Sequence, residues 1–243
     1  MAVAALTDAH IYANGLDLQG YSNQVILDAA VEDLDSTVFG TTGWRTREAG
    51  LKQVTSQVEG FFDAATLDAE VFTQFAATGI AYSVAPSSAA DGDLAYTSKV
   101  MRPSYHFGGQ VGQLIPYTSD VQGYGTPLVR GKVGHPGGTA RTTTGTGTAY
   151  QLGALSATQK LYAALHVLSV SGSATPTLTV KVQSDDASGF PSATDRITFT
   201  AATATGGQFS SVAGAVTDDW WRVSWTIAGT NPSFLFAVVF GIA

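Results

Sequence analysis

Residues 33–63 read DLDSTVFGTTGWRTREAGLKQVTSQVEGFFD and contain the two patterns that decide the fold. Up to Gly50 the stretch is polar and has glycines at positions 40, 43 and 50. An irregular stretch of about twenty residues is long for a compact domain, and such loops usually have a function. We therefore expect Val31–Gly50 to be a contact-forming loop. From Leu51 to Asp63 the alternation of a half-buried strand returns, with one face formed by Val54, Ser56, Val58, Gly60 and Phe62.

Two aromatic residues mark the loop as a candidate contact site. Phe39 and Trp44 flank Gly40 and Gly43, and Arg45 follows directly. Aromatic and Arg side chains are typical anchors of protein–protein interfaces. The alternative is that Phe39 and Trp44 fold back onto their own domain as a lid.

The first half of the chain predicts a complete β domain with one helix. Asn14-Gly15 is a hairpin signal, and Val25, Leu27 and Ala29 alternate in the next strand. Thr66 can cap a helix over 67–77, whose apolar stripe would be Leu67, Val71 and Phe75. Further strands are expected at 80–84, 94–106, 113–122 and 128–133, so we place the first domain at residues 1–134.

The second half predicts a separate β-sandwich domain over residues 150–243. Residues 135–149, HPGGTARTTTGTGTA, are rich in Gly and Thr and predict a linker. Strands are expected at 160–170, 177–184, 196–201, 220–228 and 233–240. Residues 160–170 are almost continuously apolar, which is typical of a central strand. In 220–228 we expect Trp221, Val223, Trp225 and Ile227 to point inward.

Composition restricts the possible partners. Cysteine is absent, so disulfide and thiolate chemistry are excluded. No apolar run reaches the roughly 18 residues of a membrane helix, and we expect no membrane partner. Residues 1–135 contain 14 acids and 7 bases, whereas residues 136–243 contain 5 of each. An acidic half repels phosphate, so specific reading of nucleic acid is disfavoured, although DNA could slide past such a surface.

We find no pattern for catalysis and expect no enzymatic activity, catalytic residue, cofactor or metal. The four histidines are dispersed, and His166 lies in the most apolar strand, where a core role is favoured. No G-x-S-x-G elbow is present. The pairs Asp91/Asp93 and Asp185/Asp186 fit turns better than calcium loops. An enzyme such as a glycan hydrolase remains the weakest alternative, because sequence does not show which carboxylates face each other.

The order of motifs over residues 8–134 resembles the tail tube (major tail) proteins of long-tailed, siphovirus-like bacteriophages. The resemblance runs through IYANGLDLQGYSNQV (11–25), LDSTVFGTTGWRTREAGLKQVTSQVEGFFD (34–63), the helix, and VGQLIPYTSDVQGYGTPLVRGKV (111–133). It implies a tail-tube β-barrel or sandwich with one flanking helix. By analogy, the second β-sandwich would lie on the outer tail surface.

The resemblance also implies a function and partners. Subunits would assemble six to a ring, and stacked rings would form a hollow tube through which DNA passes non-specifically during genome ejection. Partners would be further copies of the chain, a tape measure protein and tail terminator or distal tail proteins. The protein would be assembled in the host cytoplasm and located in the virion tail. The implied inter-ring loop consists of Asp35, Phe39, Gly40, Trp44, Arg45, Arg47 and Glu48.

A binding module is the main alternative function. A phage decoration or receptor-binding protein could contact glycans through the second sandwich, because an exposed Trp can stack on a sugar ring. Alternation leaves Trp220 pointing outward, which makes it the candidate glycan contact.

Overall fold

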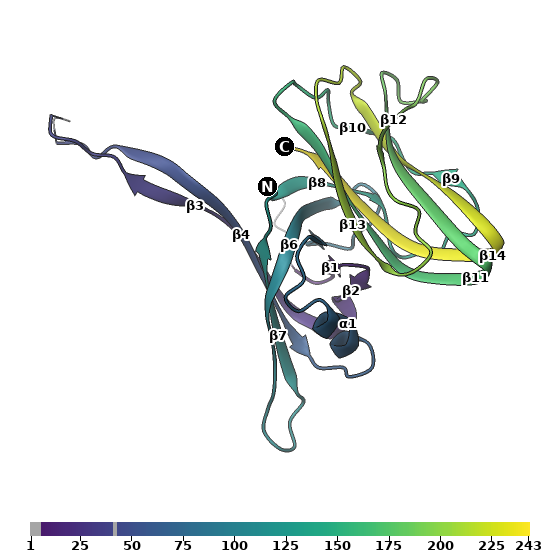
Figure 1. Cartoon of the computed structure of the whole chain (residues 1–243), viewed down its shortest axis with the longest axis horizontal. Helices are drawn as coiled ribbons and strands as arrows, with labels where there is room; N and C mark the ends of the chain where they lie inside the picture. The colour runs from purple at the N-terminus through teal and green to yellow at the C-terminus, as the bar shows by residue number, and fades with distance from the viewer. Residues whose placement is uncertain (1–5, 41–42) are drawn as a thin grey trace.

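The computed structural model describes residues 6–40 and 43–243 and shows a β-rich body from which one long hairpin projects (Figure 1). The prediction of a mainly β protein with one flanking α-helix is confirmed. In chain order the elements are β1 (His10–Ala13), β2 (Leu16–Asp17), η1 (Gln19–Tyr21), β3 (Ser22–Asp35), β4 (Arg47–Phe61), α1 (Leu67–Thr73), β5 (Ile80–Ala85), β6 (Leu94–Phe107), β7 (Pro116–Gly123), β8 (Val129–His135), β9 (Gly145–Thr146), β10 (Tyr150–Gln151), β11 (Lys160–Asp185), β12 (Thr194–Thr198), β13 (Gly206–Ala213) and β14 (Trp220–Ile242).

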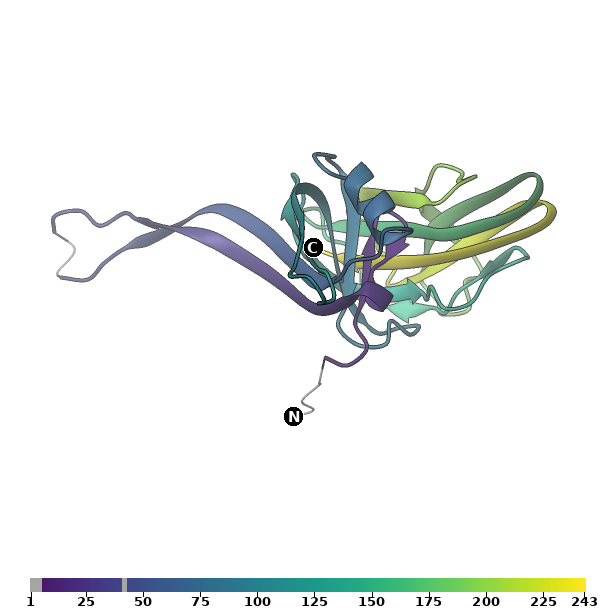
Figure 2. The same cartoon turned by 90° about the horizontal axis from the view of Figure 1, so that it is seen from below.

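The strands form one branched antiparallel sheet in the described part of the chain. The main path runs β12-β11-β14-β8-β6-β5-β1-β2, and β6 also pairs with β7. From there a second branch continues through β7 to β4 and β3. This branch, β6-β7-β4-β3, is called the edge sheet below. It carries the long projecting hairpin (Figure 2).

Two hydrophobic cores fill the body, one from each half of the sequence. Strands β11 and β14 supply most of the second core, including the fully buried Trp221 and Phe236. The first core lies between the edge sheet, β1, β5 and α1, and includes Leu18, Val58 and Tyr117. The inward positions predicted for β14 are correct, since Trp221, Val223 and Trp225 are buried and Ile227 packs against this core.

A third buried cluster joins the two halves. It combines Tyr12 and Ala95 from the first half with Ala237 and Val239 from the second. The backbone is continuous across the same junction, because β8 pairs with both β6 and β14. Close contact is needed here: a Cβ on Gly134 would lie 2.1 Å from the Phe240 ring. The halves are therefore in direct, tightly packed contact.

Residues 135–149 lie against the second half. His135 ends β8, and its Nδ1 donates to the Phe236 carbonyl oxygen over 2.9 Å. Thr146 pairs with Ser224 of β14. Burial lowers the pKa of His135 to about 4, so this imidazole is neutral at physiological pH. The division of the chain into two domains joined by a linker stays a prediction. The predicted linker segment, residues 135–149, packs against the second half.

The prediction of an irregular loop over Val31–Gly50 is wrong at both ends, because strand structure extends into this segment from each side. Strand β3 continues to Asp35 and β4 begins at Arg47, and the ladder pairs Asp35 with Arg47. In this part of the hairpin both faces are exposed, so no burial alternation marks the strands. The backbone ladder forms without that signal. Alternation in the body half of β4 is as predicted for Val54, Ser56, Val58 and Gly60, which are buried, whereas Phe62, predicted on the same face, follows the end of β4 and is half-buried.

The helix also differs from expectation. It ends at Thr73 rather than Ala77, and Phe75 is 51% exposed rather than part of the buried stripe, which consists of Leu67 and Val71. Thr66 makes no side-chain cap. Instead the Asp63 carboxylate accepts from the Thr66 amide over 2.7 Å and from the Leu67 amide over 3.3 Å. An Asp four residues before the first helical residue thus satisfies amide groups that have no partner within the helix.

The hairpin predicted at Asn14-Gly15 is confirmed. Strands β1 and β2 pair antiparallel around it, and both turn residues have positive φ, 49° for Asn14 and 87° for Gly15. No helix in the described residues has the length and apolarity needed to cross a membrane.

We predict that Asp63→Ala lowers the free energy of unfolding by about 1 kcal/mol, because two amides at the start of α1 lose their acceptor. Thr66→Ala is the matched control and should change it by less than about 0.5 kcal/mol, because its side chain caps nothing. Urea unfolding monitored by far-ultraviolet circular dichroism measures both. Equal losses in the two variants would contradict the assignment of the cap to Asp63.

Candidate functional site

The projecting hairpin is the most unusual surface of the molecule. Strand β7 pairs with β4 only from Thr55 to Phe61. Residues 29–35 of β3 and 47–54 of β4 therefore pair only with each other, as a two-stranded ribbon that leaves the body (Figure 1). We call residues 29–54 the arm. Eight strand residues span about 26 Å, which sets the reach of the ribbon before its tip.

The predicted interface residues all lie in the distal arm. Phe39 and Trp44 are 108% and 80% exposed, so neither packs on its own body as a lid. Gly40 has φ of 103° and lies in the turn between them. Arg45 is exposed, and Glu48 lies opposite Leu34 in the ladder. The structure thus brings Asp35, Phe39, Gly40, Trp44, Arg45, Arg47 and Glu48 together at one end of the molecule.

Local polar contacts order the strands next to the tip. The Arg47 guanidinium is paired with the Asp33 carboxylate across the ladder, at side-chain exposures of 49% and 55%. Asp35 accepts from the Thr37 amide over 3.0 Å, and hydrogen bonds from Thr37 lower the pKa of this carboxyl. An exposed ion pair contributes at most about 1 kcal/mol. These contacts bridge the two strands of the hairpin but contribute little to the free energy of folding.

Sequence reasoning missed part of the apolar surface of the arm. Val31, Leu34 and Leu51 are 50%, 44% and 81% exposed. An isolated two-stranded ribbon is marginally stable in water. Within one copy these apolar side chains of the ribbon are exposed to solvent.

A second exposed apolar group lies at the opposite end of the edge sheet. It consists of the ends of β4 and β6 and the β6–β7 turn, and its members are Phe61, Phe107, Val111, Leu114 and Ile115, all between 44% and 106% exposed. We call it the turn patch. It holds together locally, because Phe62 stacks on Phe107 at 4.8 Å and donates its amide to the Ile115 carbonyl over 2.8 Å. Its sequence signal is the run of apolar residues in the glycine-rich segment 107–115.

The edge sheet has one face on the first core and one free face. The free face carries polar and acidic side chains on all four strands, among them Asp28, Gln57, Glu59 and Asp120. Gln57 donates to Asp120 over 3.0 Å, and Ser104 also donates to that carboxylate. Residues 22–30, 53–61, 103–107 and 116–123 contain no Lys or Arg. The free face is therefore polar with a negative bias.

Both outer strands of the edge sheet have unpaired backbone in the described part of the chain. Strand β3 pairs only with β4. On β6, residues 103–107 pair with β7 on one side and have no backbone partner on the other. These free segments are level with each other, because Ser22 is in line with Gly60, Tyr117 and Phe107 across the ladder. Open sheet edges of this kind favour pairing with another chain.

Two polar groups singled out in the sequence, His166 and Asp185, have structural partners. His166 is fully buried, and its Nε2 lies 3.0 Å from the Ser83 hydroxyl. Burial lowers its pKa to about 3, so it is a neutral core residue. Asp185 accepts from the Ala187 and Ser192 amides and orders a turn. No group of three or more His, Cys, Asp or Glu within metal-binding distance occurs among the described residues.

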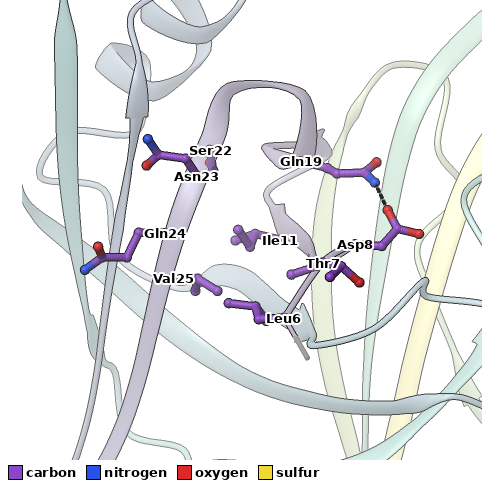
Figure 3. Close-up of a pocket in the computed structure, with 10 residues that line it drawn as sticks. Leu6, Thr7, Asp8, Ile11, Gln19, Ser22, Asn23, Gln24 and Val25 are labelled. Atoms are coloured by element: carbon purple, nitrogen blue, oxygen red, sulfur yellow. Dashed lines mark hydrogen bonds between the residues drawn. The ribbon is translucent and has the colours of Figure 1, made fainter. Parts of the chain in front are cut away.

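A small pocket lies beside the root of β3 but has no catalytic group. Its volume is about 290 Å³, and Figure 3 shows it between the segment before β1 and the start of β3. The one carboxylate among its lining residues, Asp8, is hydrogen-bonded to Gln19. Trp220, the candidate glycan contact, is half-buried at the start of β14, where it pairs with Gln151 and Asp185.

No family model and no curated protein matches the sequence. Among solved structures, a chain of the native gene transfer agent virion is similar over 50% of this chain and 95% of its own, at 19% identity and TM-score 0.40. The SPP1 tail tube protein is similar over 50% of this chain and 76% of its own chain, at 11% identity and TM-score 0.39. The SPP1 Dit protein is similar over 97% of this chain and 99% of its own chain, at 10% identity and TM-score 0.34. At these values the case for function rests on this chain's own geometry.

We predict that Phe39→Ser and Trp44→Ser each change the free energy of unfolding of the monomer by less than about 0.5 kcal/mol, because neither ring is buried. The matched control is Trp221→Ala in the second core, where loss of a fully buried ring should cost about 3–5 kcal/mol. Chemical unfolding at a concentration where the protein is monomeric measures all three. A loss above 2 kcal/mol for Trp44→Ser would show that the tip packs on its own body.

Proposed function

We propose that this chain is a structural subunit that assembles with copies of itself into the tail tube of a long-tailed bacteriophage. The observation that carries the proposal is the arm: a two-stranded ribbon with exposed apolar side chains, for which the body of the same chain offers no covering surface. Burying Phe39 and Trp44 in another copy would contribute roughly 1.5–3 kcal/mol each. The sequence resemblance described above supports the same conclusion.

The edge sheet supports a closed ring. Its four strands alternate in direction, β3 opposite to β4, β4 to β7 and β7 to β6. An even number of strands allows β3 of one copy to continue antiparallel beside β6 of the next. Repetition of this heterologous contact around an axis closes a ring and removes the open edges. A ring of six follows from the family resemblance and belongs to the proposal.

The free face of the edge sheet supports a lumen. In a closed ring the first core packs on one face of the sheet, so the other face forms the wall of the channel. That face offers Asp28, Glu59 and Asp120 among amides and hydroxyls, carries Ile26 and His106 as well, and has no Lys or Arg. Such a surface repels the DNA backbone and forms no strong contacts that would slow its passage. The tube would thus conduct DNA without any enzymatic step.

The proposed location is the virion tail, after assembly in the host cytoplasm. A tape measure protein inside the tube and terminator or distal tail proteins at its ends are further proposed partners. The second half would lie on the outer surface. Decoration or receptor binding through Trp220 remains the second candidate function, and glycan-array binding that is lost in Trp220→Ala would favour it.

Electron microscopy of the purified protein tests the proposal directly. We expect concentrated wild-type protein to form hollow tubes of constant diameter, visible in negative stain. In Trp44→Ala the folded body should persist while tube growth falls at least tenfold, because interface anchors of this kind are worth about 2 kcal/mol or more. Thr200→Ala, on the exposed surface of the second half, is the matched control and should form normal tubes. A wild-type protein that stays monomeric at millimolar concentration would refute the proposal.

Charge reversal tests the assignment of the lumen. Tubes of the double variant Asp28→Lys with Glu59→Lys should bind short duplex DNA, protect it from nuclease, and release it between about 50 and 200 mM salt, because binding would depend on phosphate contacts. Wild-type tubes should bind none.

The control for this experiment is Asp186→Lys with Asp219→Lys, which makes the same change in charge in the second half. Any DNA bound by those tubes should stay sensitive to nuclease. Protection by the control but not by the first variant would place the free face of the edge sheet outside the channel.

A further inference from the structure

The arm and the turn patch lie at opposite ends of the same strands. The arm extends from the N-terminal end of β4, and Phe61 at the other end of β4 pairs with Pro116 beside the β6–β7 turn. In Figure 1 the arm and this turn project from the body in different directions. The 15 residues of β4 span about 48 Å. The two surfaces are therefore too far apart to meet within one copy.

The chemistry of the two surfaces is complementary. The tip between Asp35 and Arg47 carries Phe39, Trp44 and one cation, Arg45, and no acid. The five members of the turn patch are all apolar, and residues 103–118 contain no Lys or Arg.

Acidic groups border the turn patch. Residues 59–75, which run from the last residues of β4 through α1, contain four acids, Glu59, Asp63, Asp68 and Glu70, and no base. Asp68 lies near the turn patch, because it accepts a hydrogen bond over 3.1 Å from the hydroxyl of Tyr105, whose ring contacts Phe107. An apolar tip with a positive charge thus matches an apolar surface with a negative border.

The turn patch is built as a receiving surface. Phe62 stacks on Phe107, and Tyr105 lies 5.7 Å from Phe107 and 6.4 Å from the buried Tyr117, centroid to centroid. The row of rings thus connects the exposed patch with the first core. A supported apolar surface of this kind loses little conformational entropy when it is covered. The arm supplies the projecting partner, and the patch supplies the surface that is packed on its own core.

We propose that the turn patch of one copy is the docking site for the arm tip of a second copy, with Phe39 and Trp44 on Leu114, Val111 and Phe107 and with Arg45 near the acids that follow β4. This inference rests on the proposed function, which requires self-assembly, and it names the surface that receives the arm. Because donor and acceptor lie at opposite ends of each copy, the contact is head-to-tail and continues from copy to copy along the strand direction. It is separate from the edge-to-edge pairing that closes a ring.

Cysteine cross-linking tests the contact, because the wild-type chain has no cysteine. The double variant Phe39→Cys with Leu114→Cys, assembled and then oxidised, should give a ladder of disulfide-linked dimers, trimers and higher polymers on a non-reducing gel. Each single variant should give dimers at most. The matched control, Phe39→Cys with Thr200→Cys on the second half, should give no ladder. A ladder in the control but none in the first double variant would overturn the proposal.

A mixing experiment separates the two ends of the contact. Leu114→Asp with Val111→Asp blocks the patch and leaves the arm intact, and both side chains are exposed, so the fold should persist. Trp44→Ala weakens the arm and leaves the patch intact. Neither variant alone should elongate, whereas their mixture should form short complexes in which one variant's arm occupies the other's patch. Normal tubes from the patch variant alone would overturn the proposal.

The experiments separate failure of the docking site from failure of self-assembly into tubes. If wild-type protein forms tubes but the patch variant also does, self-assembly stands and the docking site is wrong. If wild-type protein forms no tubes, the cysteine pair is oxidised in the oligomers present at the highest attainable concentration. A Phe39–Leu114 cross-link there supports the docking site without a tube, and its absence refutes both.

Discussion

The backbone hydrogen bonding of β4 is the constraint on which the rest of the structure depends. In its second half β4 lies between β3 and β7, so both of its edges are paired and one face packs on the first core. In its first half it pairs with β3 alone and has no core beneath it. A Cβ on Gly60 would lie 1.9 Å from the Tyr21 carbonyl oxygen, so the chain is anchored closely where β4 ends. One strand thus connects the packed body to a two-stranded ribbon that has no core of its own.

The junction of the two halves connects the edge sheet to the second core. The edge sheet meets the second half through β6 and β8, and β8 pairs with β14. The same junction contains small residues such as Ala85, Ala95 and Ala237, together with the Ser83–His166 hydrogen bond. Neutral His166 stacks on Tyr12 at 5.4 Å, so an aromatic pair adds to the hydrogen bond. Close packing of small residues and specific polar contacts thus join the two halves directly.

Sequence periodicity predicted the strands that have one buried face and missed the strands of the arm, which are exposed on both faces. Val54, Ser56 and Val58 alternate because one face of β4 lies on a core, and this pattern is visible in the sequence. The arm strands have no such face, so their ladder leaves no periodic signal. Composition alone marked Phe39 and Trp44, as aromatics between glycines. The turn patch was missed because four of its members lie in the glycine-rich segment 107–115, which has no strand periodicity, and the fifth, Phe61, comes from β4 and is brought beside them by long-range pairing with β7. Asp63 was missed as a cap because it lies three residues before Thr66 rather than at the expected position.

The period of two along the strands assigns separate roles to neighbouring residues. On β4, Val58 faces the core, while Gln57 and Glu59 on either side face the polar surface. The same strand ends in Phe61 at the turn patch and begins in the arm. Because adjacent side chains point to opposite faces, a shift of register by one residue would exchange the acidic face with the core face. The polar face, the core and the two apolar ends are thus all fixed by the single register of β4 against β3 and β7, and a change in that register would disrupt them together.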